Sequence, residues 1–169
     1  MDGSPVSWRR GEFEISTDAT RVDLETVHRF LSEQAYWSPG VPLDVVRRAI
    51  EGSVVFGVYR MGERAEQSEQ VGFARVVTDK ATFGWIGDVF VVERHRGQGL
   101  SKWLMECIFA HPDLQGFRRW MLATRDAQGL YAQYGFTPLH DPTRFMERWD
   151  PDVYSLGRET AVIREGDRT

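Results

Sequence analysis

The stretch from residue 83 to residue 108 constrains the fold of this chain more than any other. Residues 83–92 form an apolar run rich in aromatic and β-branched side chains, which predicts a buried central strand. Gly97 and Gly99 follow this run, and residues 100–108 then carry apolar side chains at helical spacing. The stretch therefore predicts a strand, a glycine-containing turn and a helix in direct succession.

The turn has the composition of an anion-binding loop. Gly97 and Gly99 allow positive φ angles and a close approach of a ligand to the backbone, and the helix that follows directs its first N–H groups outward. Arg94, Arg96 and Lys102 add positive charge beside these donors. A dinucleotide-binding fingerprint is excluded, because Lys102 stands where its third glycine would be. The residues alone leave two interpretations open: a phosphate site, or a turn that only joins a strand to a helix.

Two sequence blocks resemble those of a known family. Residues 94–99, RHRGQG, match the Q/R-x-x-G-x-G/A loop of the GNAT superfamily of acyl-CoA-dependent N-acetyltransferases, in which a hydrophobic strand also precedes the loop. Residues 122–136, LATRDAQGLYAQYGF, resemble the downstream block of that family, where a strand leads into A-x-x-L-Y-x-x-x-G-F. The blocks occur in the family's order, so the chain resembles an acyltransferase of this superfamily.

This resemblance implies an α/β (α+β) fold. Residues 1–150 would form a single N-acetyltransferase domain, and residues 151–169 a C-terminal tail. The central sheet would be mixed and mostly antiparallel, with about six to seven strands and about four helices around it. Its fourth and fifth strands would be parallel neighbours that splay apart around the cofactor. A length of 169 residues suits one domain of this kind.

The remaining pattern predicts the other elements of the fold. Besides the central strand, strands are expected at residues 13–16, 53–60, 70–78, 119–124, 136–139 and 143–149. Besides the helix that begins at residue 100 and ends before the His111-Pro112 pair, helices are expected at residues 24–34, 43–50 and 127–134. Residues 1–11 are polar and are expected to be loosely held. Strands two, three and four are expected to form an antiparallel meander.

The activity implied by the resemblance is transfer of an acetyl group from acetyl-CoA to a primary amine of a small molecule or peptide, by direct attack in a ternary complex. Acetyl-CoA would be the co-substrate, and no metal is expected. The pantetheine would pair with the backbone of the fourth strand at a bulge, and the pyrophosphate would lie at the glycine loop. The cofactor-binding residues implied by the family motifs are Phe90, Val91, Val92, Arg96, Gly97, Gln98, Gly99, Leu100, Ser101, Lys102, Ala127 and Tyr131.

Two residues are candidates for proton transfer. Tyr131 occupies the position where the family often places a tyrosine near the CoA sulfur, so it is the candidate general acid; the alternative is a core aromatic with a hydrogen-bonded hydroxyl. Asp88 is the candidate base, because an unpaired carboxylate in an apolar strand is costly and calls for a function. Its short side chain favours a role relayed by water, and the alternative is an ion pair with Arg75 on the adjacent strand.

The acceptor site is predicted from aromatic residues. Tyr36, Trp37, Arg75 and Trp85 are the candidate residues, and an aromatic pocket with one carboxylate would favour a cationic amine. Alternatively, Tyr36 and Trp37 only fill the gap between helix and sheet. Thr124 stands where the family usually has an asparagine, which removes one expected contact.

Composition excludes several classes of partner. The net charge of −4 argues against a general nucleic-acid binder, which needs clustered Lys and Arg. No run reaches the about 18 apolar residues of a membrane span, and the first residues lack the apolar core of a signal peptide. We therefore expect no nucleic acid, no membrane and a cytoplasmic location. The resemblance allows a homodimer.

The single cysteine and the histidines suggest no metal site. Cys107 lies on the apolar face of the predicted helix and is expected to be a core thiol. The four histidines show no metal-ligand spacing among themselves or with Cys107, and His95 is expected at the surface. Two other functions are kept as alternatives. One is a non-catalytic acyl-CoA-binding sensor, and the other is a cysteine hydrolase, which would need an exposed thiol beside a histidine.

Overall fold

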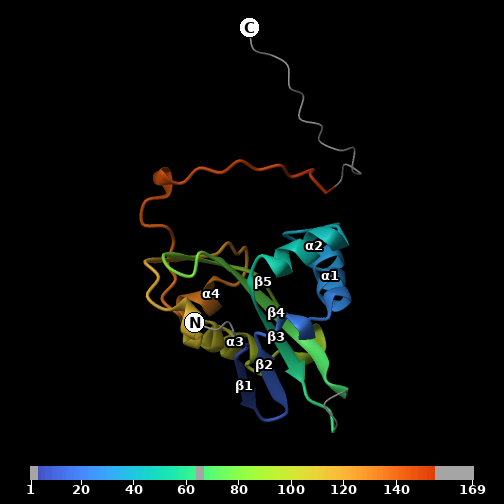
Figure 1. Cartoon of the computed structure of the whole chain (residues 1–169). Helices are drawn as coiled ribbons and strands as arrows, with labels where there is room; N and C mark the ends of the chain where they lie inside the picture. Colours follow the sequence, from blue (N-terminus) through green and yellow to red (C-terminus); the bar gives the residue numbers. More distant parts are fainter. Residues whose placement is uncertain (1–3, 64–66, 155–169) are drawn as a thin grey trace.

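A computed structural model describes residues 4–63 and 67–154 and shows a six-stranded sheet with helices on both faces (Figure 1). The strands are β1 (Ser7–Arg10), β2 (Phe13–Ser16), β3 (Val54–Arg60), β4 (Glu69–Thr78), β5 (Phe83–Val91) and β6 (Arg119–Met121). The α-helices in the described residues are α1 (Leu24–Glu33), α2 (Leu43–Glu51), α3 (Leu100–Ala110) and α4 (Gln128–Ala132).

The strands lie in the sheet in the order in which they occur in the chain. Every neighbouring pair from β1 to β5 is antiparallel, whereas β5 and β6 are parallel. The chain passes through α3 between these two strands, as a parallel connection requires. The predicted α/β (α+β) fold, with a mostly antiparallel sheet and one parallel pair, is therefore confirmed.

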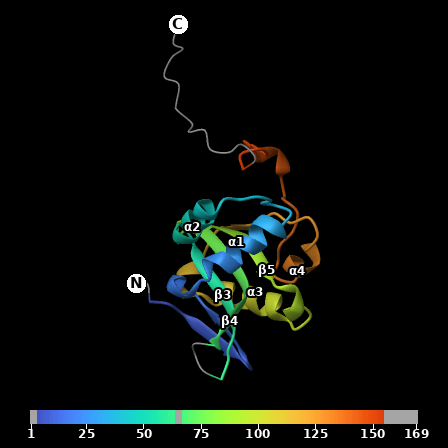
Figure 2. The same ribbon diagram turned by 90° about the vertical axis from the view of Figure 1, so that its right-hand side faces the viewer.

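Each face of the sheet carries its own hydrophobic core. Helices α1 and α2 cover one face, where Phe90 of β5 stacks on Phe30 of α1 with ring centroids 3.9 Å apart. Helix α3 packs on the other face through Trp103, Leu104 and Ile108, all of which are buried. The two views of the ribbon show these layers on either side of the sheet (Figures 1 and 2).

Local sequence signals set the ends of the helices. Asp23 precedes α1, and its side chain accepts a hydrogen bond from the backbone N–H of Thr26 at 3.0 Å. Gly99 precedes α3 with a φ of 77°, in the left-handed region that glycine adopts without strain. Helix α3 ends at Ala110, before His111-Pro112, as the proline predicts. In the described part of the chain, no helix combines the length and apolar character needed to cross a membrane.

The N-terminal prediction was wrong, because residues 7–10 form a strand. Strand β1 pairs with β2 across a tight turn at Gly11, whose φ is 58°. The burial of β2 against the rest of the sheet makes this hairpin favourable. The side chains of β1 are largely exposed, so its sequence shows no apolar alternation.

The C-terminal strands predicted at residues 136–139 and 143–149 are absent. That stretch contains only a short 3-10 helix, Pro142–Arg144, and β6 is also shorter than predicted. Pro138 and Pro142 lack the N–H that a strand ladder needs, which weakens both segments as strands. Within the described residues the sheet therefore has six strands, in agreement with the expected six to seven. Of the predicted tail, residues 155–169 lie outside the described part of the chain.

One buried histidine makes a testable contribution to stability. His111 is 6% exposed, packs edge-on against Phe56, and accepts a hydrogen bond at Nδ1 from the backbone N–H of Asp113 at 3.2 Å. Burial lowers its pKa below the ordinary 6.5. The unfolded chain therefore binds the proton more readily, so the free energy of unfolding decreases as the pH falls below about 6.5. His95 is buried with a lowered pKa too and contributes in the same direction.

We expect urea denaturation between neutral pH and about pH 5.5 to show this loss of stability. The loss should be smaller in His111→Gln, which retains only the His95 contribution. His140→Gln is the matched control, because His140 is exposed. An identical pH dependence in wild type and His111→Gln would contradict the assignment.

Candidate active site

The parallel strands β5 and β6 part after three residue pairs. Their register runs from Phe83 opposite Arg119 to Trp85 opposite Met121, and β6 ends there. Strand β5 continues to Val91 with β4 on one side only. A strand edge of this kind presents backbone N–H and C=O groups that require other partners. The predicted splayed pair is therefore present, and it leaves an open edge on β5.

The backbone of β5 shows which residues face this open edge. The N–H of Val92 donates to the carbonyl of Val71 at 2.9 Å, and the carbonyl of Val92 accepts from the N–H of His95. Both groups of Val92 are thus engaged within the protein, which corrects the expectation that they are available to a ligand. Because backbone direction alternates along a strand, Phe90 also faces β4, opposite Phe73, which corrects the prediction that its backbone groups bind the cofactor. Val91 and Val89 face the open side.

A bulge interrupts the pairing of β4 and β5 at Asp88. The register passes from Phe73 opposite Phe90 to Arg75 opposite Gly87, so Asp88 and Val89 together face a single residue of β4. Asp88 has a φ of 53°, which is unusual for a residue other than glycine. The bulge expected on this strand therefore coincides with the candidate base.

The glycine loop lies directly beyond the open edge. Gly97 and Gly99 have φ angles of 76° and 77°, and a Cβ on either would meet no atom within 4 Å. Both positions therefore favour glycine because of their positive φ angles, and no other part of the protein covers the loop at these two positions. The first N–H groups of α3, on Leu100, Ser101 and Lys102, have no acceptor within the helix. The loop has the conformation of an anion site at a helix start.

The side chains around the loop have different roles. Arg96 donates from Nε to the carbonyl of Val91 at 3.0 Å, so its stem fixes the loop to the end of β5. Arg94 forms an ion pair with Glu69 of β4. Gln98 and Lys102 are exposed, whereas Leu100 is buried and anchors the helix. His95, which was predicted at the surface, is buried edge-on against Phe13; this prediction was wrong.

A cavity of about 350 Å³ opens beside the bulge, between the α1–α2 loop, the sheet and the start of α4. Its floor is apolar and includes Val27, Leu31 and Val46. The structure brings the predicted acceptor and catalytic residues together in its wall, along with part of the predicted cofactor set. Those lining residues are Tyr36, Trp37, Arg75, Trp85, Asp88, Ala127 and Tyr131.

Asp88 is held by two hydrogen-bond donors, Arg75 and Trp37. Arg75 donates from Nε to Oδ2 of Asp88 at 2.5 Å, and Trp37 donates from Nε1 to Oδ1 at 3.0 Å. Arg75 also donates from Nη1 to the hydroxyl of Ser53 at 3.3 Å. The side chain of Asp88 is 12% exposed and that of Arg75 is 21% exposed. The alternative interpretation of Asp88, an ion pair with Arg75, is thus present, and both carboxylate oxygens accept hydrogen bonds.

Tyr131 lines the cavity from α4. The residue is 8% exposed, and its hydroxyl makes no hydrogen bond to any described residue. Burial, together with the nearby Tyr36 and Asp126, raises the pKa of Tyr131 to about 12. The phenol therefore stays protonated near neutral pH and can act as a hydrogen-bond or proton donor there. The hydroxyl of Tyr134, one turn on, donates to the carbonyl of Lys102 at 2.8 Å.

Some residues at the site had no sequence signal. The backbone N–H of Arg125 donates to the hydroxyl of Tyr36 at 2.8 Å, and the Arg125 guanidinium lies 3.8 Å from the centre of that ring. Ser53 supports Arg75 from the start of β3. Thr124 accepts at Oγ1 from the N–H of Ala127 at 3.0 Å, so it shapes the start of α4. The contacts of Tyr36 with Arg125 and of Ser53 with Arg75 depend on tertiary structure, and no motif predicts them. The contact of Thr124 is local, and this position was noted in the sequence only as a departure from the family's asparagine.

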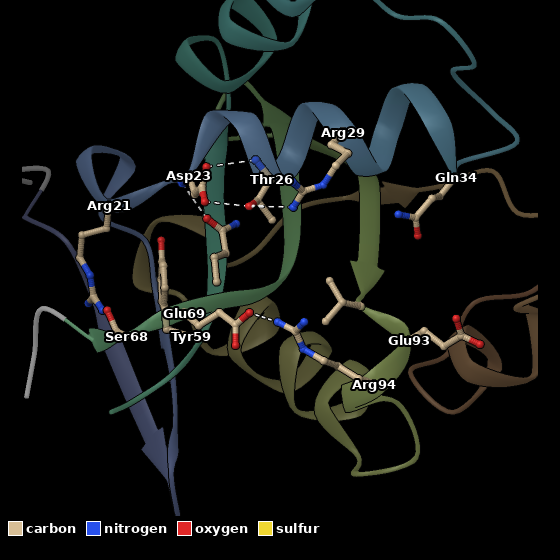
Figure 3. Close-up of a pocket in the computed structure, with 12 residues that line it drawn as sticks. Arg21, Asp23, Thr26, Arg29, Gln34, Tyr59, Ser68, Glu69, Glu93 and Arg94 are labelled. Atoms are coloured by element: carbon tan, nitrogen blue, oxygen red, sulfur yellow. Dashed lines mark hydrogen bonds and ion pairs between the residues drawn. The ribbon is translucent and has the colours of Figure 1, made fainter. Parts of the chain in front are cut away.

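A larger groove of about 1010 Å³ lies between α1, the start of β4 and the end of β5 (Figure 3). It shares only Val92 with the predicted cofactor residues. Figure 3 shows Arg94 reaching across it to Glu69. Cations and anions balance in its wall, so it lacks the positive excess that suits a phosphate group. These charged residues are Arg21, Arg29, Arg94, Asp23, Glu69 and Glu93.

Neither a metal centre nor a reactive thiol is found in the described residues. They contain no group of three or more His, Cys, Asp or Glu side chains that could hold a metal ion. Cys107 is 2% exposed, and burial raises its pKa to about 12. A cysteine nucleophile needs an accessible thiolate, so the hydrolase alternative is contradicted.

Comparison with known proteins relates this geometry to one family. The family described as acetyltransferase (GNAT) domain matches residues 54–138. A candidate acetyltransferase of the fungus Gibberella zeae is 31% identical over 145 residues, which cover 76% of this chain and 81% of that protein.

Solved structures agree with this match. A crystal structure from Xanthomonas campestris, described as a candidate acetyltransferase of the GNAT family, is 49% identical. The likeness covers 87% of this chain and 99% of that one, with a TM-score of 0.80. A structure from Clostridium acetobutylicum, described as a predicted acetyltransferase with acetyl-CoA, shares the fold at 12% identity, with a TM-score of 0.58 and coverage of 80% and 94%.

Proposed function

Because this chain belongs to the GNAT acetyltransferase family, we propose that it transfers the acetyl group of acetyl-CoA to the primary amine of a small molecule or peptide. One observation carries the proposal. The open edge of β5 connects the glycine loop at one end with the cavity that contains Tyr131 at the other. A ligand with an anionic end and an extended arm fits such a path, because the arm can pair with the strand while the anion meets the helix start.

The residues of this chain fit acetyl-CoA. The backbone groups of Val89 and the N–H of Val91 would pair with the pantetheine, because the carbonyl of Val91 already accepts from Arg96. The N–H groups of Leu100, Ser101 and Lys102 would hold the pyrophosphate, supported by Arg96, Gly97, Gln98 and Gly99. The positive φ of both glycines and the openness of the loop support this assignment. Bound acetyl-CoA would supply an acetyl group activated as a thioester.

The acceptor would occupy the cavity beside Asp88. A volume of about 350 Å³ suits a small amine or a single side chain of a peptide. Tyr36, Trp37 and Trp85 offer aromatic faces, which attract an ammonium group on its way in. The apolar floor would receive the carbon skeleton of the acceptor. These features favour an amine with an apolar or aromatic body.

The acceptor amine must lose a proton before it attacks, because an alkyl ammonium has a pKa of about 10.4. Asp88 is already bonded to Arg75 and Trp37, so we assign it a positioning role: its charge attracts the ammonium and it orients its two partners. Water at the cavity mouth would accept the proton. Tyr131 would donate a hydrogen bond to the departing sulfur, since burial keeps its hydroxyl protonated.

The hydroxyl of Tyr131 can be tested by activity measurements. Thiol release from acetyl-CoA, measured against a panel of amines, polyamines, amino acids, aminoglycosides and peptides, should show turnover with one class of acceptor. Tyr131→Phe should lower kcat by roughly 10²-fold with little change in acetyl-CoA affinity, because only the donor hydroxyl is removed. Tyr134→Phe is the matched control, since its hydroxyl bonds to the backbone of α3.

Two results would argue against this function. Tight binding of acetyl-CoA without turnover on any acceptor would favour the non-catalytic sensor. Absence of acetyl-CoA binding would contradict the assignment of the open edge and the glycine loop.

A variant of Asp88 separates a positioning role of this residue from proton transfer by it. Asp88→Asn should lower kcat/KM by about 10- to 100-fold, the effect of losing a charged hydrogen bond to Arg75. The shape of the pH–rate profile should not change, because the amine itself sets its acid limb. Asp126→Asn is the control, since Asp126 lines the same cavity but is largely exposed. Loss of the acid limb in Asp88→Asn alone would show instead that Asp88 is the base.

A further inference from the structure

Gly87 leaves a gap in the face of the sheet that lines the acceptor cavity. Trp85 and Gly87 are two positions apart on β5, so they lie on the same face of the sheet. Arg75 of β4 is paired directly with Gly87 and shares that face. All three residues line the cavity of about 350 Å³. Trp85 and Arg75 are therefore neighbours across a position that has no side chain.

Neither conformation nor packing requires glycine at this position. The φ of Gly87 lies outside the left-handed region, and the unusual backbone of the bulge falls on Asp88 instead. A Cβ on Gly87 would meet Nε1 of Trp85 at 3.4 Å and Nη2 of Arg75 at 3.9 Å, which are ordinary contact distances. Glycine weakens the interior of a strand, and one use of it there is the close approach of a ligand. Gly87 thus provides space beside two nitrogen atoms.

Both nitrogen atoms carry N–H groups that lack a partner in the described part of the chain. The indole N–H of Trp85 has no acceptor there. Arg75 uses Nε for Asp88 and Nη1 for Ser53, which leaves Nη2 without an acceptor among the same residues. The side chain of Arg75 is only 21% exposed, and polar groups in such places usually have a partner. Two donors beside one gap fit one acceptor group of a ligand.

A carboxylate matches these donors better than a neutral oxygen atom does. A hydrogen bond between a guanidinium and a carboxylate is strong because both groups are charged. The carboxylate of Asp88 occupies Nε of Arg75, so a second carboxylate at Nη2 would need a positive group beside it. The side chain of Asp126, another anion of the cavity wall, is 62% exposed and paired with Arg125, so it opposes a bound carboxylate only weakly.

The ion pair of Asp88 and Arg75 fits an amine and a carboxylate that are held close together. In an α-amino acid both groups are bonded to the same carbon atom, so they can reach an anion and a cation that are themselves in contact. Nε of Arg75 and Oδ2 of Asp88 are 2.5 Å apart. The apolar floor of the cavity, with Val27, Leu31 and Val46, can receive an apolar side chain.

We propose that the acceptor is a free α-amino acid with an apolar side chain, whose carboxylate binds beside Gly87 to Nη2 of Arg75 and the indole N–H of Trp85. This inference rests on the proposed acetyl transfer. The α-amine attacks the thioester carbonyl of acetyl-CoA, so a C–N bond forms and the C–S bond breaks. Of the two protons that the ammonium nitrogen loses, one goes to water and the other to the sulfur, which leaves as the thiol of CoA.

Matched pairs of acceptors test the carboxylate. Leucine, phenylalanine and tryptophan are compared with isopentylamine, phenethylamine and tryptamine, which differ from them only by lacking the carboxylate. We expect kcat/KM per neutral amine to be about 10- to 100-fold higher for the preferred amino acid than for its amine, the effect of charged hydrogen bonds. An amine that reacts as fast as its amino acid overturns the inference and leaves acetyl transfer intact. So does a preference for leucinamide over leucine, because the site would then recognise a peptide carbonyl.

Gly87→Ala should remove this preference, because its methyl group would lie in the gap beside both nitrogen atoms. We expect kcat/KM for the amino acid to fall at least about 10-fold, with little change for the matching amine. Trp85→Phe removes the N–H but keeps an aromatic ring, and it should act in the same direction. Trp149→Phe is the matched control, since Trp149 is 75% exposed and lies outside the cavity lining. Equal losses for the amino acid and the amine in Gly87→Ala would contradict a carboxylate site.

Calorimetry distinguishes a failure of this inference from a failure of the proposed function. The amino acid and its matching amine are titrated into the protein in the presence of excess CoA, which carries no acetyl group. Binding of the amino acid that is weakened in Gly87→Ala supports the carboxylate site, whether or not acetyl transfer is observed. Amino acids that do not bind, or that bind no more tightly than their amines, overturn it.

Discussion

The parting of β5 and β6 after Trp85 is the constraint on which the candidate site depends. Had the ladder continued, the backbone groups of residues 86–91 would be paired within the sheet and no ligand could use them. Because β6 stops at Met121, β5 keeps a free edge that ends at the glycine loop. The cavity lies at the other end of this edge, beside the bulge at Asp88. Binding and chemistry are thus arranged along one strand.

Hydrogen bonds across the cavity hold its wall in place on the side of the α1–α2 loop. Asp88 joins β5 to β4 through Arg75 and to the α1–α2 loop through Trp37. Tyr36 joins the same loop to the start of the α4 segment through the N–H of Arg125. The loop that bears both aromatic residues is therefore tied to the sheet and to α4. A cavity wall that is held from two sides is suited to orient a small acceptor.

Much of this was predictable from local sequence. The central strand and α3 were placed within about one residue, because apolar periodicity, two glycines and a proline mark them directly. Strand β1 was missed because its side chains are exposed, and the two C-terminal strands were wrong because pairing depends on a partner that composition does not specify. Of the predicted side chains that line the cavity, Ala127 and Tyr131 came from a family motif, whereas Tyr36, Trp37 and Asp88 were predicted from their residue type. The bond from Trp37 to Asp88 joins residues 51 positions apart and has no local signal.

The binding path along β5 is tested most directly by amide hydrogen exchange with and without acetyl-CoA. The co-substrate should slow exchange at Val89 and Val91 of β5 and at the first N–H groups of α3, on Leu100, Ser101 and Lys102. Thr26 and Gln70, which line the larger groove, should exchange at the same rate in both states. Protection confined to that groove, or no protection along β5, would contradict the claim that the free edge of β5 is the binding path.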